Sequence, residues 1–143
     1  MTRVYVDVVG DLFHIGHINM FKKARSLFKE PYLIVGVHAD KDVASYKRSP
    51  IISESDRYEI IRNCKLVDEV IESSPLYITK KFIIENDIHY VVHGDDISEE
   101  LKRQHKVPSD LGIVRYVPYT SGVSTTEIIN KIKNTKSTSK LKS

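Results

Sequence analysis

Two histidines stand three residues apart around a glycine in the stretch "GDLFHIGHINMFKKA", residues 10–24. The stretch begins where a β-branched run stops and passes into a helical spacing, which puts His14 and His17 at a loop-to-helix junction. The first N–H groups of a helix are free and its dipole favours an anion, while Gly16 leaves room for close approach. The pattern predicts a phosphate cradle of two imidazoles above free amides.

The same pair of histidines has two other interpretations. His14 would serve only as a helix cap, with His17 a satisfied surface residue. Alternatively the pair would hold zinc, but no cysteine or third histidine lies nearby in the sequence to complete such a site.

A second stretch with phosphate-binding character is "TSGVSTTE", residues 120–127, where Gly122 precedes Ser124, Thr125 and Thr126. Ser124 and Glu127 have the spacing of a capping box, which predicts a well-capped helix start. Hydroxyl groups and free amides at one helix end also suit a second group of phosphates. The two interpretations are compatible.

Five runs of strand length alternate with helical patterns along the chain. The strand runs are 3–9, 32–39, 66–71, 88–94 and 112–117. Helical spacing occurs around residues 20–28, 53–63, 79–85 and 125–132, and a polar loop is expected between residues 95 and 111. This alternation predicts an α/β fold, a doubly wound parallel five-stranded sheet in a single domain. The domain would span residues 1–133, followed by a flexible basic tail at 134–143.

The residues that could do chemistry follow the predicted strands. Residues 10–17 follow the first strand, 38–47 the second, 93–96 the fourth and 120–126 the fifth. Ligands of such sheets bind beyond the carboxyl ends of the strands. The four segments are therefore expected to meet at one edge and form one site.

Composition limits the class of protein. The chain has 143 residues, 41% hydrophobic and 29% charged, with a net charge of +3. These values suit a soluble domain, and so small a positive charge does not favour nucleic-acid binding. The apolar runs are too short to cross a bilayer and the start lacks a signal peptide's layout, so a cytoplasmic protein without stable membrane insertion is expected. Cys64 is the only cysteine, which excludes an internal disulfide.

Several motifs together resemble the cytidylyltransferase family of HxGH nucleotidyltransferases. They are "DLFHIGH", "YLIVGVHAD", the loop lysine of "YK", the arginine-bearing "SESDRYEIIRNCKLVDEVI" and "GVSTTEII". The likeness runs from about Val4 to Ile132 and is strongest to the enzymes that act on phosphoethanolamine and phosphocholine. It implies a Rossmann-like fold, a homodimer, and transfer of CMP from CTP to a phosphomonoester with Mg²⁺ bound through the CTP phosphates.

The resemblance also implies roles for individual residues. His14 and His17 would contact the CTP phosphates, with positive charge supplied by Lys47 and Arg57. The residues implied to position the nucleotide and its metal are Asp11, Gly16, Asp95, Gly122, Ser124, Thr125 and Thr126. Asp7, Leu76 and Tyr90 would face the acceptor substrate.

The sequence departs from the family's pattern in three places. Tyr119 stands where the family carries an arginine, so that phosphate contact is missing or has moved, for instance to Arg115. In "DVVGD", Val8 and Gly10 replace the usual glycine and phenylalanine. Leu76 stands where choline enzymes carry tryptophan, which removes one aromatic face for a quaternary ammonium.

The resulting expectation is an enzyme of phospholipid precursor synthesis with phosphoethanolamine as the favoured acceptor and phosphocholine next. A glycerol-3-phosphate cytidylyltransferase, an adenylyltransferase of the same superfamily and a nucleotide-binding regulator with weakened catalysis are the alternatives. The reaction starts from a phosphate that is already anionic, so positioning and charge neutralisation would suffice without a strong general base.

Overall fold

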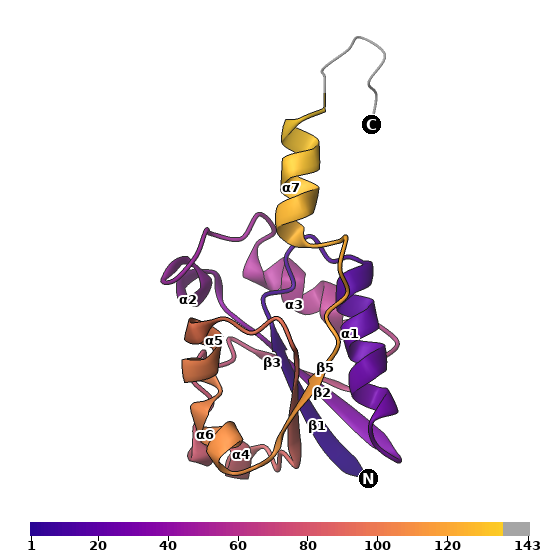
Figure 1. The fold of residues 1–143 in the computed structure, drawn as a ribbon, viewed down its shortest axis with the longest axis vertical. Coiled ribbons are helices and arrows are strands. Elements are labelled where there is room, and N and C mark those ends of the chain that lie inside the picture. The colour runs from indigo at the N-terminus through magenta and orange to yellow at the C-terminus, as the bar shows by residue number, and fades with distance from the viewer. Residues whose placement is uncertain (136–143) are drawn as a thin grey trace.

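Five parallel strands form one sheet in the computed structural model, which describes residues 1–135 (Figure 1). The strands are β1 (Thr2–Val8), β2 (Pro31–Val37), β3 (Glu69–Glu72), β4 (Tyr90–Gly94) and β5 (Val114–Val117). Their order is β3-β2-β1-β4-β5. The predicted doubly wound parallel five-stranded sheet is confirmed. From residue 136 on, the tail expected at 134–143 lies outside the described residues.

Seven helices connect or follow these strands in the described part of the chain. They are α1 (Ile15–Ser26), α2 (Asp40–Ala44), α3 (Glu54–Arg62), α4 (Lys80–Glu85), α5 (Glu99–Gln104), α6 (Lys106–Asp110) and α7 (Thr125–Lys133). The polar loop expected after β4 is wrong, since α5 and α6 occupy it. These helices have only five or six residues, and the side chains buried there include the polar Gln104 and His105. The sequence therefore shows no helical spacing of apolar residues from which they could be predicted.

The two faces of the sheet bury separate sets of side chains because successive residues of a strand point to opposite sides. Val4 and Val6 of β1 pack in a core with Phe21 of α1 and Ile61 of α3. Tyr5, between them, packs on the other face in a core that includes residues of α4. Helices therefore cover both faces and leave the strand ends open.

The strand order changes direction at β1, which pairs with β2 on one side and with β4 on the other. The loops that leave β1 and β4 diverge at such a point, so a crevice forms beyond their carboxyl ends. Gly10 turns the chain there with φ of 73°. A Cβ at Gly10 would lie 2.6 Å from Ile61 Cδ1, so a larger side chain at this position would require Ile61 to move.

The last helix, α7, stands out from the body of the fold, with its first turn beside the crevice (Figure 1). Ser124 caps it by accepting a hydrogen bond from the backbone N–H of Glu127, which confirms the predicted cap. None of the helices in residues 1–135 is both long and apolar enough to span a membrane.

Candidate active site

A cavity of about 390 Å³ opens at the carboxyl edge of the sheet. Residues from all four expected segments line it, together with the end of β1. Among the residues predicted to form a site, the lining contains Asp7, Asp11, His14, Gly16, His17, Lys47, Ser124, Thr125 and Thr126. The tertiary structure thus assembles one cavity from segments more than 100 residues apart.

His14 and His17 are joined by a reciprocal cap at the start of α1. His14 Nδ1 accepts a hydrogen bond from the Gly16 N–H at 3.0 Å, and the His14 N–H donates to His17 Nδ1 at 3.1 Å. A ring nitrogen that accepts carries no proton, so each neutral ring holds its hydrogen on Nε2. The helix-cap and cavity interpretations therefore hold together, because the Nδ1 atoms cap the helix and each ring keeps an Nε2–H donor.

Both imidazoles are neutral near pH 7 in the free protein. Burial lowers the pKa of His14 below its ordinary value, against the opposing charge of Glu127. Burial, with repulsion from His14, lowers the pKa of His17 to about 4. The pair therefore meets an incoming anion with N–H donors aligned at a helix N-terminus, not with two full positive charges.

Gly16 makes room for the capping imidazole. A Cβ at this position would lie 2.7 Å from His14 Cε1 and 2.9 Å from His14 Nδ1. Any side chain at Gly16 would therefore push the His14 ring out of its capping position, in addition to narrowing the approach to the helix amides.

The start of α7 forms another part of the cavity wall and is tied to the rest of the site by two hydrogen bonds. Thr125 Oγ1 donates to the backbone carbonyl of Asp11 at 2.8 Å. Arg48 Nη1 donates to Thr126 Oγ1 at 3.1 Å. A second helix N-terminus, with its hydroxyl groups and an exposed guanidinium, thus faces the same cavity as the histidine pair.

Lys47 and Arg48 are the lysine and the arginine in the cavity lining. Burial and the adjacent Arg48 lower the pKa of Lys47, while Asp11 opposes the change. The guanidinium of arginine stays charged at any physiological pH and presents several donors in one plane. Arg48 is therefore the permanent cation of this wall.

The buried carboxylate of Asp11 shapes the loop that carries these cations. Its two oxygens accept hydrogen bonds from the backbone N–H groups of Ile51 and Ile52, at 2.8 and 2.9 Å. Asp11 therefore fixes the end of the Lys47–Arg48 loop against the first strand's exit.

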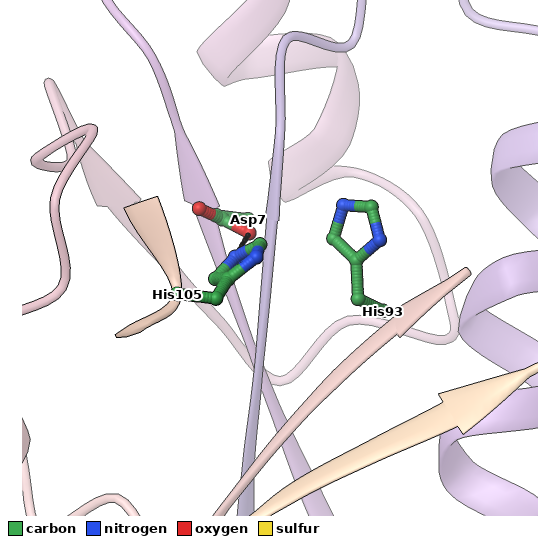
Figure 2. A group of neighbouring side chains, drawn as sticks. All are labelled: Asp7, His93 and His105. Atoms are coloured by element: carbon green, nitrogen blue, oxygen red, sulfur yellow. Dashed lines mark hydrogen bonds and ion pairs between the residues drawn. The ribbon is translucent and has the colours of Figure 1, made fainter. Parts of the chain in front are cut away.

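Asp7 lies at the end of β1 with three histidines around it. His105 Nε2 donates to Asp7 Oδ1 at 3.1 Å, and His38 Nε2 lies 3.5 Å from Asp7 Oδ2. His93, from β4, completes the group (Figure 2). Burial alone would raise the pKa of Asp7, but the hydrogen bonds from His105 and His38 outweigh it and hold that pKa well below its usual range. The cavity wall thus contains an ionised carboxylate.

His38 is held on both ring nitrogens. Its Nδ1 lies 3.1 Å from the carbonyl oxygen of Ser74, which can only accept a hydrogen bond. Burial lowers the pKa of His38, but the hydrogen bond and charge of Asp7 raise it more, so the pKa stays above its ordinary value.

The sequence pattern of the cytidylyltransferase-like family matches residues 10–131. The chain belongs to the cytidylyltransferase-like family. The ethanolamine-phosphate cytidylyltransferase of Dictyostelium discoideum is 39% identical over 132 residues, covering 91% of this chain and 36% of the relative. Choline-phosphate cytidylyltransferase A of Mus musculus is 38% identical over 134 residues, covering 92% and 36%. The chain thus spans little more than a third of these curated relatives.

Solved structures share the fold of this chain. The lipopolysaccharide core biosynthesis protein from Thermoplasma volcanium is 28% identical, with a TM-score of 0.67 over 84% of this chain and 97% of that one. Pantothenate synthetase from Thermus thermophilus is 15% identical, with a TM-score of 0.56 over 90% and 61% of the two chains, and shows a shared fold alone.

Arg57 differs from its expected place in this cytidylyltransferase-like chain. It is fully buried and does not line the cavity. Its Nε donates to Ile52 O, its Nη1 to the carbonyl oxygens of Val9 and His38, and its Nη2 to Asp40 Oδ1 at 2.6 Å. All three of its nitrogens are engaged in these bonds, so the structure gives Arg57 a structural role in place of the predicted phosphate contact.

Tyr90 and Leu76 also lie outside the cavity lining. Tyr90 begins β4, at the strand end opposite the cavity, where its ring stacks on Phe28 with centroids 4.6 Å apart. Arg115, the suggested replacement for the family's arginine, lies 4.9 Å from the Tyr90 ring centroid. The expectation that Tyr90 and Leu76 face the acceptor is therefore corrected: Tyr90 lies at the amino end of β4, whereas the cavity lies at the carboxyl ends of the strands, and Leu76 lies between β3 and α4.

Asp95 and Gly122 take supporting positions. Asp95 Oδ1 accepts a hydrogen bond from the Tyr119 N–H at 2.9 Å, while its neighbour Asp96 lines the cavity. Gly122 has φ of 83° in the turn before α7, and Val123 lines the cavity in its place. Asp95 and Gly122 therefore lie next to residues of the cavity lining without belonging to it.

Sequence reasoning missed Arg48, Tyr46 and His105. Arg48 and Tyr46 flank Lys47 in the sequence, and this adjacency was the available signal. His105 meets Asp7 across 98 residues of chain, within a segment expected to be loop. No local pattern predicts such a pair.

Proposed function

We propose that this chain transfers CMP from CTP to a small phosphomonoester and releases pyrophosphate, in phospholipid precursor synthesis. The observation that carries the proposal is the pair of Nε2–H donors on His14 and His17 in a cavity bounded by two helix N-termini. Membership of the cytidylyltransferase-like family and the names of the relatives support it.

In the proposed reaction, a phosphate oxygen of the acceptor attacks the α-phosphorus of CTP, and the bond from that phosphorus to the bridging oxygen of the β-phosphate breaks. The nucleophile needs no proton removed, which agrees with histidines that are neutral donors. His14 and His17 stabilise the charge that develops on the transferring phosphate, while Lys47 and Arg48 neutralise the departing pyrophosphate. Two anions are thereby brought together without a general base.

Mg²⁺ would arrive with CTP as part of the substrate and would reduce the negative charge of its phosphates. The cavity suits an ion carried in this way, because both oxygens of the buried Asp11 carboxylate already accept hydrogen bonds from backbone amides. Asp96 is an exposed carboxylate of the lining that could contact the ion's water shell.

For the acceptor we propose phosphoethanolamine, with phosphocholine second. A primary ammonium needs hydrogen-bond acceptors, and the Asp7 carboxylate in the cavity wall supplies them. A quaternary ammonium needs several aromatic faces, each contributing roughly 0.5 to 2 kcal/mol. Tyr46 and Tyr119 are the tyrosines of the lining, while Tyr90 lies elsewhere and Leu76 offers no ring. Glycerol 3-phosphate would leave Asp7 without a charged partner.

The proposal is tested by measuring pyrophosphate release with CTP and each of the three acceptors, with ATP as the alternative nucleotide. We expect kcat/KM to be largest for CTP with phosphoethanolamine. Asp7→Asn should raise KM for phosphoethanolamine and leave KM for CTP nearly unchanged. A preference for phosphocholine or glycerol 3-phosphate would overturn the acceptor, and nucleotide binding without pyrophosphate release would overturn catalysis. Sedimentation of the same samples tests the homodimer that we also propose.

A further inference from the structure

Asp7, His93 and His105 bring three ligand atoms together from three separate segments. One carboxylate oxygen and one nitrogen from each ring all lie within 4.8 Å of one another. Asp7 lies near the end of β1, His93 belongs to β4, and His105 lies between α5 and α6 (Figure 2). Asp7 and His93 line the cavity, so the group is reached from solvent, while His105 is fully buried behind them.

The hydrogen bonds around the two imidazoles prepare them as ligands. His93 Nδ1 lies 2.9 Å from the carbonyl oxygen of Gly94, which only accepts, so Nδ1 carries the proton and Nε2 keeps a free lone pair. A backbone carbonyl that accepts a hydrogen bond from the other ring nitrogen orients the histidines that bind metals. His93 is therefore set to offer Nε2.

His105 contains an unsatisfied polar atom. Its Nδ1 is buried and has no hydrogen-bond partner among residues 1–135. Because Nε2 of the same ring faces Asp7, this Nδ1 lies on the other side of the imidazole and can take up the ring's proton when Nε2 binds an ion. The nitrogen that His105 offers to the described cluster is therefore Nε2, 3.1 Å from Asp7 Oδ1.

We propose that Asp7, His93 and His105 form a binding site for a divalent transition-metal ion, with Zn²⁺ as the best fit. Two imidazoles and one carboxylate are the donor set of zinc sites that keep a fourth position open, here toward the cavity. Mg²⁺ prefers oxygen ligands alone, so the site discriminates against the ion carried by a nucleotide.

The distance between Asp7 and His105 agrees with this choice, and ligand atoms that lie up to 4.8 Å apart would have to approach one another by about 1.5 Å when the ion binds. Asp7 Oδ1 and His105 Nε2 are 3.1 Å apart. Two ligands with zinc bonds of about 2.0 to 2.1 Å in tetrahedral geometry lie roughly 3.3 Å apart. Zinc would take the place of the proton shared by this pair, and that proton would pass to Nδ1 of the same imidazole, which stays neutral.

The consequence for activity rests on the function proposed above. If Asp7 holds the ammonium of the acceptor, then Zn²⁺ on Asp7 excludes that acceptor. Zinc would therefore inhibit competitively with phosphoethanolamine and not with CTP. The site would act as an inhibitory metal site next to, and separate from, the histidine pair of α1.

The test is a calorimetric titration of chelator-treated, desalted protein with Zn²⁺ in the presence of excess Mg²⁺, followed by metal analysis. We expect one Zn²⁺ per chain, bound at least about tenfold more weakly by His93→Ala. His93 is half-buried, so this variant avoids the risk to folding of changing His105. The matched control is His89→Ala, which changes an exposed histidine outside the cluster, near Asp87, and should bind as the parent does.

Replacing Zn²⁺ with Co²⁺ adds a signature independent of activity, since a tetrahedral cobalt site with nitrogen ligands has visible absorption. Its loss in His93→Ala would support the assignment. Absence of binding, equal binding by His93→Ala, or binding lost only in His17→Ala would overturn it. Binding at this cluster that does not compete with phosphoethanolamine would support the metal site and overturn the proposed place of the acceptor.

Discussion

The backbone N–H of His14 donates to Nδ1 of His17, and with this bond the first turn of α1 settles which nitrogen of His17 carries the proton. The matching bond from Gly16 N–H to His14 Nδ1 does the same for His14. Helix capping and ligand binding are therefore one arrangement, in which the backbone prepares two side-chain donors before any ligand arrives.

This arrangement predicts different results for two substitutions of His14. His14→Ala removes both the cap and the donor, so it should destabilise the fold by about 1 kcal/mol and lower kcat by at least about a hundredfold. His14→Asn keeps a capping oxygen and should recover the stability but not the activity. Urea unfolding and pyrophosphate release measure the two effects. Near-parental turnover in His14→Asn would disprove the donor role.

Gly16→Ala tests the space beside the His14 ring. The new Cβ would displace an imidazole whose Cε1 lies 2.7 Å from it, so kcat should fall by about tenfold even though alanine favours a helix. Lys22→Ala on the exposed side of the same helix is the control and should leave kcat unchanged. Equal turnover in Gly16→Ala and the parent would show that the ring has other room to move.

Arg48 is expected to supply positive charge to the nucleotide. Arg48→Ala should raise KM for CTP by about tenfold, because it removes a charged donor at the start of α7. Arg115→Ala is the matched control, since that arginine lies over Tyr90 at the far end of β4. Initial rates measured against CTP concentration give KM for both variants. An equal rise of KM for CTP in both would contradict the role of Arg48.

Arg57 is expected to act on stability. Arg57→Ala leaves the Asp40 carboxylate and three carbonyl oxygens without their donor, which should cost about 3 to 5 kcal/mol. Denaturant unfolding should show this loss. If the variant kept parental stability and lost only its affinity for CTP, the originally predicted phosphate contact would be restored.

The low pKa of His17 makes stability depend on pH. The folded pKa of about 4 lies below the ordinary value of about 6.5, so the unfolded chain binds more protons between these values. Stability attributable to His17 is complete above about pH 6.5 and falls as the pH drops toward 4. Between pH 7.5 and pH 5, the free energy of unfolding should therefore fall by about 1 to 2 kcal/mol less in His17→Gln than in the parent. If urea unfolding showed the same dependence of stability on pH in His17→Gln and in the parent, the lowered pKa of His17 would be contradicted.

The sequence by itself determined the sheet and the location of the cavity. Strand-length runs alternating with helical patterns specify parallel strands whose carboxyl ends share an edge, so His14, Lys47 and Thr126 were expected at one site, and the structure places all three in the cavity lining. Local spacing also predicted the cap at Ser124, because capping depends on residues only three positions apart.

Only the tertiary structure decided what each side chain contacts. Arg57 has the residue type of a phosphate ligand, yet its guanidinium is buried among carbonyl groups that other segments bring to it. Arg48 reaches Thr126 across 78 residues, and His105 reaches Asp7 across 98. Periodicity reports the face on which a residue lies, whereas hydrogen-bond partners, burial and protonation depend on atoms from distant segments, which no local pattern contains.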